Sequence, residues 1–260
     1  MKKEPSGDSK AWSLDQLTKS EFFHQKLHEW GLLTVATEIE RIKGETLDWN
    51  LEQLEISKPA WDKVIHRGIK PVIVFAHPAV LKDVAGSVGY YRMLSMVSQK
   101  SMNRVRLPAT RYEDGKGNPD DETALAIAQH LNRIISRLVE FDEQINAREF
   151  DLWRGMAAGS QAQGSWQNAK GSRVEIIVKG LLQRRLRDKN LVSAETEDGM
   201  RIELNDGRVV VFADEPDVAI YANDRIQAAI EIKGGIDTAG VLERVGAAIK
   251  SLRRARKENP

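Results

Sequence analysis

The feature that most constrains the fold is the stretch Phe212–Gly235, where apolar and polar residues alternate on both sides of a turn. The apolar residues of this pattern are Val218, Ile220, Ala228, Ile230 and Ile232. Side chains point alternately to the two faces of a strand, so the pattern predicts a β-hairpin with one buried face. A three-residue loop at Asn223–Arg225 would bring both apolar rows onto that face.

The opposite face of this hairpin carries three charged residues. In the expected register Asp217 lies directly across from Glu231, with side-chain roots about 5 Å apart, and Lys233 follows on the same face. Two carboxylates at this separation are poorly tolerated unless a cation lies between them, and hard oxygen ligands suit Mg²⁺. We therefore predict Asp217 and Glu231 as Mg²⁺ ligands, with the main-chain carbonyl of Ile232 as a further ligand.

The chemistry expected of such a site is phosphodiester hydrolysis. Bound Mg²⁺ polarises a phosphate and lowers the pKa of a coordinated water. Lys233 could orient or deprotonate that water and offset the charge that develops on the phosphate. Glu175, on a predicted helix before the sheet, is a further catalytic candidate, either as a supporting carboxylate or as a ligand of a second metal. Its alternative is an ion pair with Arg173 or Lys179.

Length and composition exclude several classes of protein. The chain has 260 residues, 41% of them hydrophobic, which is enough for one large domain or two smaller ones. It has no cysteine, and therefore no disulfide framework or cysteine-bound zinc. No apolar run approaches the roughly 20 residues of a membrane span, and the first residues do not resemble a signal peptide. We expect a soluble, cytoplasmic protein without a membrane partner.

The rest of the chain is expected to form two parts. Residues 1–155 read as a helical region for DNA recognition and dimerisation, and residues 156–260 as a nuclease core. A long amphipathic helix is predicted from Glu122 to about Phe150, followed by a glycine-rich linker at Gly155–Gly171. The core is predicted to contain a helix from Ser172 to Leu186, strands at Leu191–Ala194, Met200–Leu204 and Arg208–Phe212, the hairpin, and a helix at Thr238–Arg256.

The segment Lys63–Arg106 is locally basic, although the formal net charge of the whole chain is only +1. Phosphate contacts supply most of the affinity of DNA-binding proteins, and arginine reads guanine edges. This segment therefore predicts a DNA-binding surface, and a solvated helix face is the alternative. The predicted DNA-binding residues are Arg67, Lys70, Arg92, Lys100, Arg104 and Arg106. We expect at least one of the four arginines to contact a base, and Tyr90 and Tyr91 lie in the same segment.

The pattern Pro216-Asp217 followed by Glu231-Ile-Lys233 resembles the signature of the PD-(D/E)XK nuclease superfamily. Longer strings resemble the XcyI family of type II restriction endonucleases. These strings are His66–Pro71, Val74–Pro78, Gly89–Met102 and Glu231–Gly246. The resemblance implies an α/β fold of mixed α+β type, with a PD-(D/E)XK core and a large helical N-terminal region. It also implies a Mg²⁺-dependent homodimer that cuts double-stranded DNA within the palindrome CCCGGG.

Other interpretations remain open. A structure-directed nuclease such as a junction resolvase would share the core, and a truncated, poorly active DNA-binding relative would share the basic segments. A core of this superfamily usually has another strand after the helix at Thr238–Arg256, whereas the sequence stops at Pro260. We therefore expect an unpaired sheet edge near the strand that carries Glu231. N-terminal helices or a second subunit could cover this edge, but we favour a shortened family member with a weakened core.

Overall fold

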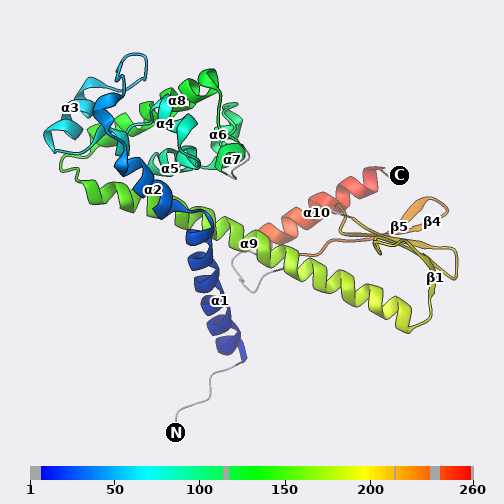
Figure 1. Cartoon of the computed structure of the whole chain (residues 1–260). Coiled ribbons are helices and arrows are strands. Elements are labelled where there is room, and N and C mark those ends of the chain that lie inside the picture. The colour runs from blue at the N-terminus through cyan, green and yellow to red at the C-terminus, as the bar shows by residue number, and fades with distance from the viewer. Residues whose placement is uncertain (1–6, 114–116, 214, 235–240, 259–260) are drawn as a thin grey trace, which may run out of the picture. The chain divides into compact units, whose positions relative to one another are not determined.

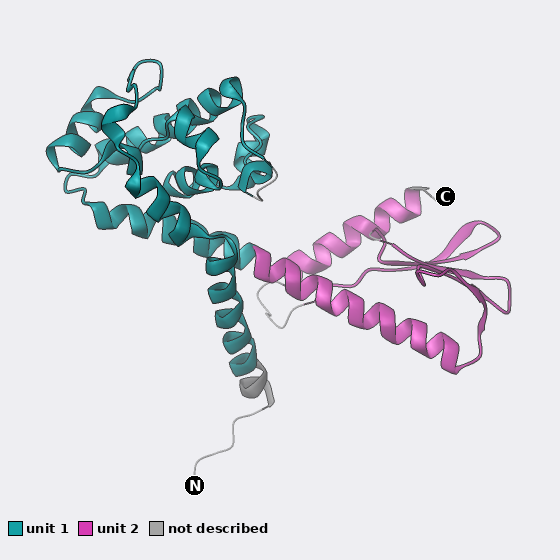
Figure 2. Ribbon diagram, viewed as in Figure 1, with its two compact units in different colours: residues 1–164 teal, residues 165–260 magenta. Residues whose placement is uncertain are grey.

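The computed structural model describes residues 7–113, 117–213, 215–234 and 241–258, with side chains described from residue 12 to residue 257 within these ranges. The chain divides into two compact units, residues 1–164 and 165–260 (Figure 2). Among the described residues, no helix is long and apolar enough to span a membrane. Helices combined with one antiparallel sheet make this a mixed α+β fold, as predicted.

Unit 1 consists of helices and short helical turns (Figure 1). Its elements are α1 (Gly7–Glu29), α2 (Leu32–Arg41), η1 (Gly44–Thr46), α3 (Lys58–His66), η2 (Pro71–Ile73), α4 (Pro78–Asp83), α5 (Ser87–Leu94), α6 (Gln99–Arg104), α7 (Thr110–Glu113), α8 (Asp121–Phe141) and the first part of α9 (Ala147–Asp188). The run Pro71–Phe75, which periodicity alone cannot assign to strand or helix, thus begins with the 3₁₀ turn η2.

Helix α8 is the centre of unit 1. Asp120 caps its first turn by accepting from the Thr123 N–H at 2.8 Å. An apolar stripe that includes Ile127, Leu131 and Ile135 is fully buried, and α3 and α4 pack against the helix. Asn132, on the same helix, is also buried, where it accepts from the Ala76 N–H and donates to two carbonyl oxygens. Its polar atoms are therefore paired, which limits the free-energy cost of burying them.

The single helix predicted from Glu122 to about Phe150 is wrong, because α8 ends at Phe141 and α9 begins at Ala147. The ammonium group of Lys63 donates to three carbonyl oxygens at the end of α8, at 2.7 to 3.0 Å. Asp142 and Asn146 then accept backbone N–H bonds two residues further on. Such local side-chain bonds compete with helical hydrogen bonds, and here they close one helix and start the next.

The predicted linker at Gly155–Gly171 is also wrong, because these residues lie inside α9. This helix runs without a break for 42 residues and can be followed from green to yellow in Figure 1. The division between the units falls within it, after residue 164. The domain boundary expected after residue 155 is therefore not marked by any loop.

Unit 2 contains the rest of α9, a five-stranded antiparallel sheet and α10 (Val241–Glu258). The strands are β1 (Val192–Glu195), β2 (Arg201–Leu204), β3 (Val209–Phe212), β4 (Val218–Ala222) and β5 (Arg225–Ile230). The three strands predicted before the hairpin are confirmed to within a residue or two as β1, β2 and β3. Their buried face packs against Leu182 and Leu186 of α9 and forms a small core.

The hairpin register is as predicted, but its loop is shorter. Val218 pairs with Ile230 and Ile220 with Ala228, whereas Ala222 pairs with Arg225 around the two-residue turn Asn223–Asp224. Both turn residues have positive φ, as a two-residue turn of the primed kind requires. A bulge between Ile220 and Tyr221 shifts the register by one residue. The shorter loop and the bulge together place both apolar rows on one face.

Strand β5 is the last in the sheet order, so no strand in the described ranges pairs with its outer edge. This matches the expectation of an unpaired edge near Glu231. Helix α10 packs against β5 and brings side chains to the end of this strand.

Candidate active site

Asp217 and Glu231 lie at the same end of the hairpin. Asp217 directly precedes β4 and Glu231 directly follows β5. Because Val218 pairs with Ile230, the two carboxylate residues are opposite each other. The N–H of Ile232 donates to Oδ2 of Asp217, which ties the chain after β5 to the residue before β4. Asp217 is 4% exposed, so its carboxylate is almost removed from solvent.

The carboxylate of Glu231 receives a donor on each oxygen. The ammonium group of Lys233 donates to Oε1, and the hydroxyl of Ser251 on α10 donates to Oε2 at 2.7 Å. The Glu231 side chain is 5% exposed and that of Lys233 is 35% exposed. Glu231 is therefore fixed inside the protein, while Lys233 remains accessible to a molecule outside it.

The electrostatics distinguish the two carboxylates. Burial raises the pKa of Asp217; the Ile232 N–H opposes this, and the nearby Glu231 and Glu175 carboxylates raise the pKa further. Burial also acts to raise the pKa of Glu231, but the bonds from Lys233 and Ser251 outweigh it and lower the pKa. Burial acts to lower the pKa of Lys233, yet the bond and the charge of Glu231 raise it overall. Lys233 is therefore a cation at neutral pH.

Glu175 forms the ion pair that was its alternative interpretation, and its catalytic role stays a prediction. Its carboxylate accepts from Lys179, one turn along α9. Its charge also acts on Asp217, so it belongs to the same electrostatic cluster. Lys179 donates as well to the Ala213 carbonyl at 2.7 Å, which links α9 to the end of β3.

A cleft of about 530 Å³ opens at this cluster. It lies within unit 2, and its lining includes Glu175, Ile232 and Lys233 together with residues of α9 and α10. Gly234 packs closely on α9: a Cβ placed there would lie 2.7 Å from Cγ2 of Val174. The chain after Lys233 can therefore approach α9 only because residue 234 has no side chain.

The donor set fits a hard divalent cation. In the described ranges, no three acidic or histidine side chains cluster closely enough to hold a metal by themselves. A metal would therefore rest on Asp217, Glu231 and a main-chain oxygen such as that of Ile232, with water completing the shell. Mg²⁺ ordinarily binds through one or two carboxylates and keeps several waters. The excess of carboxylates around Asp217 also favours a cation.

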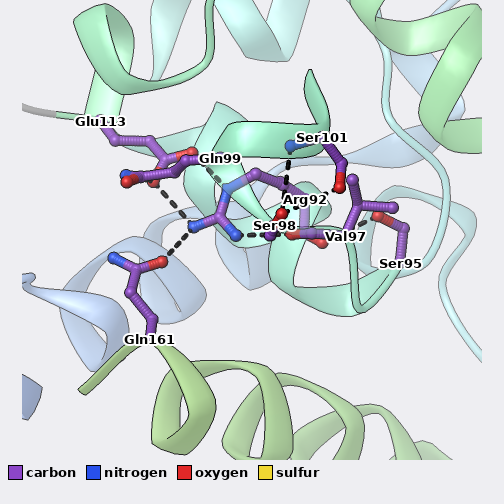
Figure 3. A network of polar contacts seen from close by, with 8 residues as sticks. All are labelled: Arg92, Ser95, Val97, Ser98, Gln99, Ser101, Glu113 and Gln161. Atoms are coloured by element: carbon purple, nitrogen blue, oxygen red, sulfur yellow. Dashed lines mark hydrogen bonds and ion pairs between the residues drawn. The ribbon is translucent and has the colours of Figure 1, made fainter. Parts of the chain in front are cut away.

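Arg92 was predicted to bind DNA, and its position contradicts this. It is 1% exposed, and its guanidinium group donates to both oxygens of Glu113, at 2.6 and 2.8 Å (Figure 3). The same group donates to the Val97 carbonyl and to the side chain of Gln161. Residues 92 and 113 are distant in sequence, so the partner that buries Arg92 is not visible in the local charge pattern.

The neighbouring tyrosines are also buried. The hydroxyls of Tyr90 and Tyr91 donate to the carbonyls of Ile73 and Val72, at 2.9 and 2.5 Å. Burial raises the pKa of Tyr90 to about 12. Both rings belong to the core of unit 1 and do not offer a surface for DNA.

The other basic candidates are exposed and form two groups within unit 1. Lys100 and Arg104 lie one turn apart on α6, with Arg106 just after it. Arg67 and Lys70 lie between α3 and η2 and line a second pocket of about 430 Å³. Lys70 also donates to the Glu40 carbonyl at 2.9 Å. These five residues remain available for contacts with phosphates or bases.

Sequence reasoning missed the contribution of α10. Ser251 contacts Glu231, and Arg254, one turn later, contacts Glu215 at 3.0 Å. A serine in a basic helix carries no signal of this kind, because the contact depends on how α10 packs on the sheet.

Comparison with known proteins gives two curated relatives and a family. The type II restriction enzymes Cfr9I of Citrobacter freundii and XcyI of Xanthomonas campestris pv. cyanopsidis are each 24% identical to this chain, over 205 and 208 residues. The aligned parts cover 73% of this chain but only 62% and 61% of the relatives, so the match spans less than two thirds of their length. No solved structure matches significantly. Residues 17–259 match the XcyI restriction endonuclease family, to which this chain therefore belongs.

Proposed function

We propose that the protein is a Mg²⁺-dependent endonuclease that hydrolyses phosphodiester bonds of double-stranded DNA, with a PD-(D/E)XK core in residues 165–260. The observation that carries this proposal is the pairing of two buried carboxylates, Asp217 and Glu231, with the accessible ammonium group of Lys233 at a cleft. Family membership supports the same reaction.

Each residue has a distinct role in this reaction. Asp217, Glu231 and the Ile232 carbonyl would hold the Mg²⁺, which when bound supplies Lewis-acid polarisation of the phosphate and a more acidic water. Lys233 is protonated at neutral pH, so it acts as a hydrogen-bond donor and positive charge towards the attacking water and the phosphate. Glu175 adds negative charge beside Asp217 and strengthens the attraction for a cation.

DNA recognition is assigned to unit 1. The predicted DNA-binding residues that are exposed are Arg67, Lys70, Lys100, Arg104 and Arg106, and Arg92 is removed from this set. We expect one of the three exposed arginines to read a guanine edge, so that truncating it costs about 1 to 3 kcal/mol at one base pair. The others would contact phosphates, so truncating any of them would weaken binding to every sequence equally. The resemblance to XcyI-type enzymes supports the palindrome CCCGGG as the target, and hence a homodimer.

The test is incubation of plasmid DNA with the protein, with and without Mg²⁺, followed by sequencing of the fragment ends. We expect discrete ends within CCCGGG, only when Mg²⁺ is present and not with Lys233→Ala. Discrete ends at another sequence would overturn the target alone. Cuts confined to branched DNA would favour a structure-directed nuclease, and an absence of cuts would reject the catalytic proposal.

A further inference from the structure

Helix α10 contacts the carboxylate of Glu231 through a small polar side chain, that of Ser251. Ser251 is 3% exposed and, together with Ala255 one turn later, forms the fully buried part of this helix among its described residues. An amphipathic helix normally places apolar side chains on its buried stripe. The hydroxyl at position 251 is therefore an exception that calls for a polar partner.

That partner is Glu231. A serine inside a helix commonly donates back to the carbonyl one turn earlier. The Ser251 hydroxyl instead donates across to Oε2 of Glu231 at 2.7 Å, while Lys233 occupies Oε1. The carboxylate is thus bonded from two different elements, and rotation about its last bond would break both contacts. The ion pair of Arg254 with Glu215 brings the same helix to the segment before Asp217.

We propose that Ser251 is a positioning residue for Glu231, holding one carboxylate oxygen so that the other stays beside Lys233 and available to the metal. This inference rests on the proposed nuclease function. Groups that hydrogen-bond a metal-ligating carboxylate fix its orientation, and removing them typically lowers metal affinity by about 10- to 100-fold. Replacing Ser251 by alanine would leave Oε2 buried without its donor and Glu231 free to turn.

The experiment compares metal binding and DNA cleavage in three variants. Mn²⁺ replaces Mg²⁺ as the probe, because bound and free Mn²⁺ are counted directly by electron paramagnetic resonance in the absence of DNA. Ser251→Ala is expected to weaken Mn²⁺ binding by about 10- to 100-fold. It should also lower kcat while leaving KM for DNA unchanged. Ser251→Thr keeps the hydroxyl and should bind Mn²⁺ more tightly than the alanine variant.

Ser136→Ala is the matched control. Ser136 is also a helical serine with 3% exposure, and its hydroxyl accepts from the Ser57 N–H within unit 1. Its loss should leave Mn²⁺ binding unchanged. Thermal unfolding of each variant shows that it is folded before its metal affinity is compared.

Each outcome decides one proposal. Normal Mn²⁺ binding by Ser251→Ala, while the parent protein binds Mn²⁺ and cuts DNA, would overturn the positioning role and leave the nuclease function intact. Equal losses in the folded Ala and Thr variants would assign the effect to packing and would also overturn it. A parent protein that neither binds Mn²⁺ nor cuts DNA would reject the proposed function itself.

Discussion

The two units bury charge in opposite ways. In unit 1 the Arg92 guanidinium meets the Glu113 carboxylate in two hydrogen bonds, and Gln99 and Gln161 complete the network (Figure 3). The charges cancel, and their donors and acceptors are used. In unit 2 the buried Asp217 faces other carboxylates, and its pKa is raised. The charge of Lys233 lowers this pKa, but not enough to offset burial and the other carboxylates.

This difference separates a structural ion pair from a binding site. A buried pair whose charges are balanced within the chain has nothing to offer a ligand, and its loss is felt in folding. Around Asp217, the carboxylates of Glu231 and Glu175 raise its pKa, and the opposing effect of Lys233 does not cancel the increase. A cluster of this kind loses stability by keeping its charges together and recovers it when a cation binds.

Among the variants of the buried Arg92–Glu113 ion pair, we expect Glu113→Ala to lower the stability most. It leaves the guanidinium of Arg92 buried without its counter-charge, so we expect a loss of about 3 to 5 kcal/mol in the free energy of unfolding. Urea denaturation measures this. The double variant Arg92→Met, Glu113→Leu removes both charges and should recover much of the loss. A fully stable Glu113→Ala would contradict the description of this pair as a structural ion pair.

Lys233→Ala tests, through DNA cleavage, whether the carboxylates around Asp217 form a catalytic site. We expect cleavage to fall by about 10²- to 10³-fold, the usual effect of removing one donor that stabilises developing negative charge. DNA binding should be nearly unchanged, because Lys233 acts on the attacking water and is only one of many positive charges that could contact DNA. Single-turnover cleavage and a separate binding assay measure the two effects. Lys58→Ala, at an exposed lysine paired with Asp62, is the control and should cleave normally.

Gly234→Ala tests whether the site around Asp217 and Glu231 depends on the close packing of residue 234 against α9. The added methyl group would lie 2.7 and 2.8 Å from two carbons of Val174, whose branched side chain cannot turn aside easily. We expect a loss of about 1 to 3 kcal/mol in stability, as for other overpacked sites, and reduced cleavage. Thermal unfolding and cleavage assays measure both.

Gly180 provides the matched control for this packing test. It lies on the same helix, α9, with nothing within 4 Å of an added Cβ, so Gly180→Ala should stabilise the protein by up to about 1 kcal/mol. Val174→Gly, which removes both colliding carbons, should relieve the effect of Gly234→Ala when the double variant is compared with Val174→Gly alone. If it did not, the predicted collision would not be the cause.

Asp217→Asn is expected to raise the free energy of unfolding, opposite in sign to Glu113→Ala and Gly234→Ala. The pKa of Asp217 is raised, so its protonated form stabilises the folded state below the ordinary Asp pKa, and this contribution is lost as the pH rises. At neutral pH without metal the ionised group therefore destabilises the fold. We expect Asp217→Asn to gain about 0.5 to 2 kcal/mol there, as at other strained sites, with no cleavage. The gain should shrink as the pH is lowered.

Glu231→Gln is the companion to that variant. The pKa of Glu231 is lowered, so its ionised form stabilises the fold above the ordinary Glu pKa, and this contribution is lost as the pH falls. We expect this variant to be less stable at neutral pH. Thermal unfolding against pH measures both variants. Shifts of the same sign would contradict the assigned electrostatics.

The sequence predicts the hairpin well because its determinants are local. Alternation around Val218 and Ile230 sets the faces, and the faces set the register that opposes Asp217 and Glu231. The loop length was predicted wrongly because two kinds of loop place both apolar rows on one face. A three-residue loop does so, and so does the two-residue turn at Asn223–Asp224 combined with a bulge, which the structure adopts.

Features that depend on distant partners were not predictable. The glycines of residues 155–171 each cost about 1 kcal/mol relative to alanine in a helix, which suggests a linker. Helix α9 nevertheless continues, because Ala158, Ala162 and Trp166 recur one turn apart as a buried stripe. Packing thus overrides local propensity. Arg92 is a similar example among the charged residues. The sequence shows that its side chain is positive, but not that Glu113 will pair with it in the core.

The order of the strands has a consequence for when activity arises during synthesis. Each strand pairs with its neighbour in sequence, so the sheet can grow by short loop closures as the chain emerges. Segments nearer the N-terminus fold first on the ribosome. Glu231 and Lys233 come after all five strands, and Ser251 follows them in the last helix. We therefore expect the five strands to be made and paired before Glu231, Lys233 and Ser251 are all in place. Under the proposed function, DNA cleavage would then begin only after the sheet has folded.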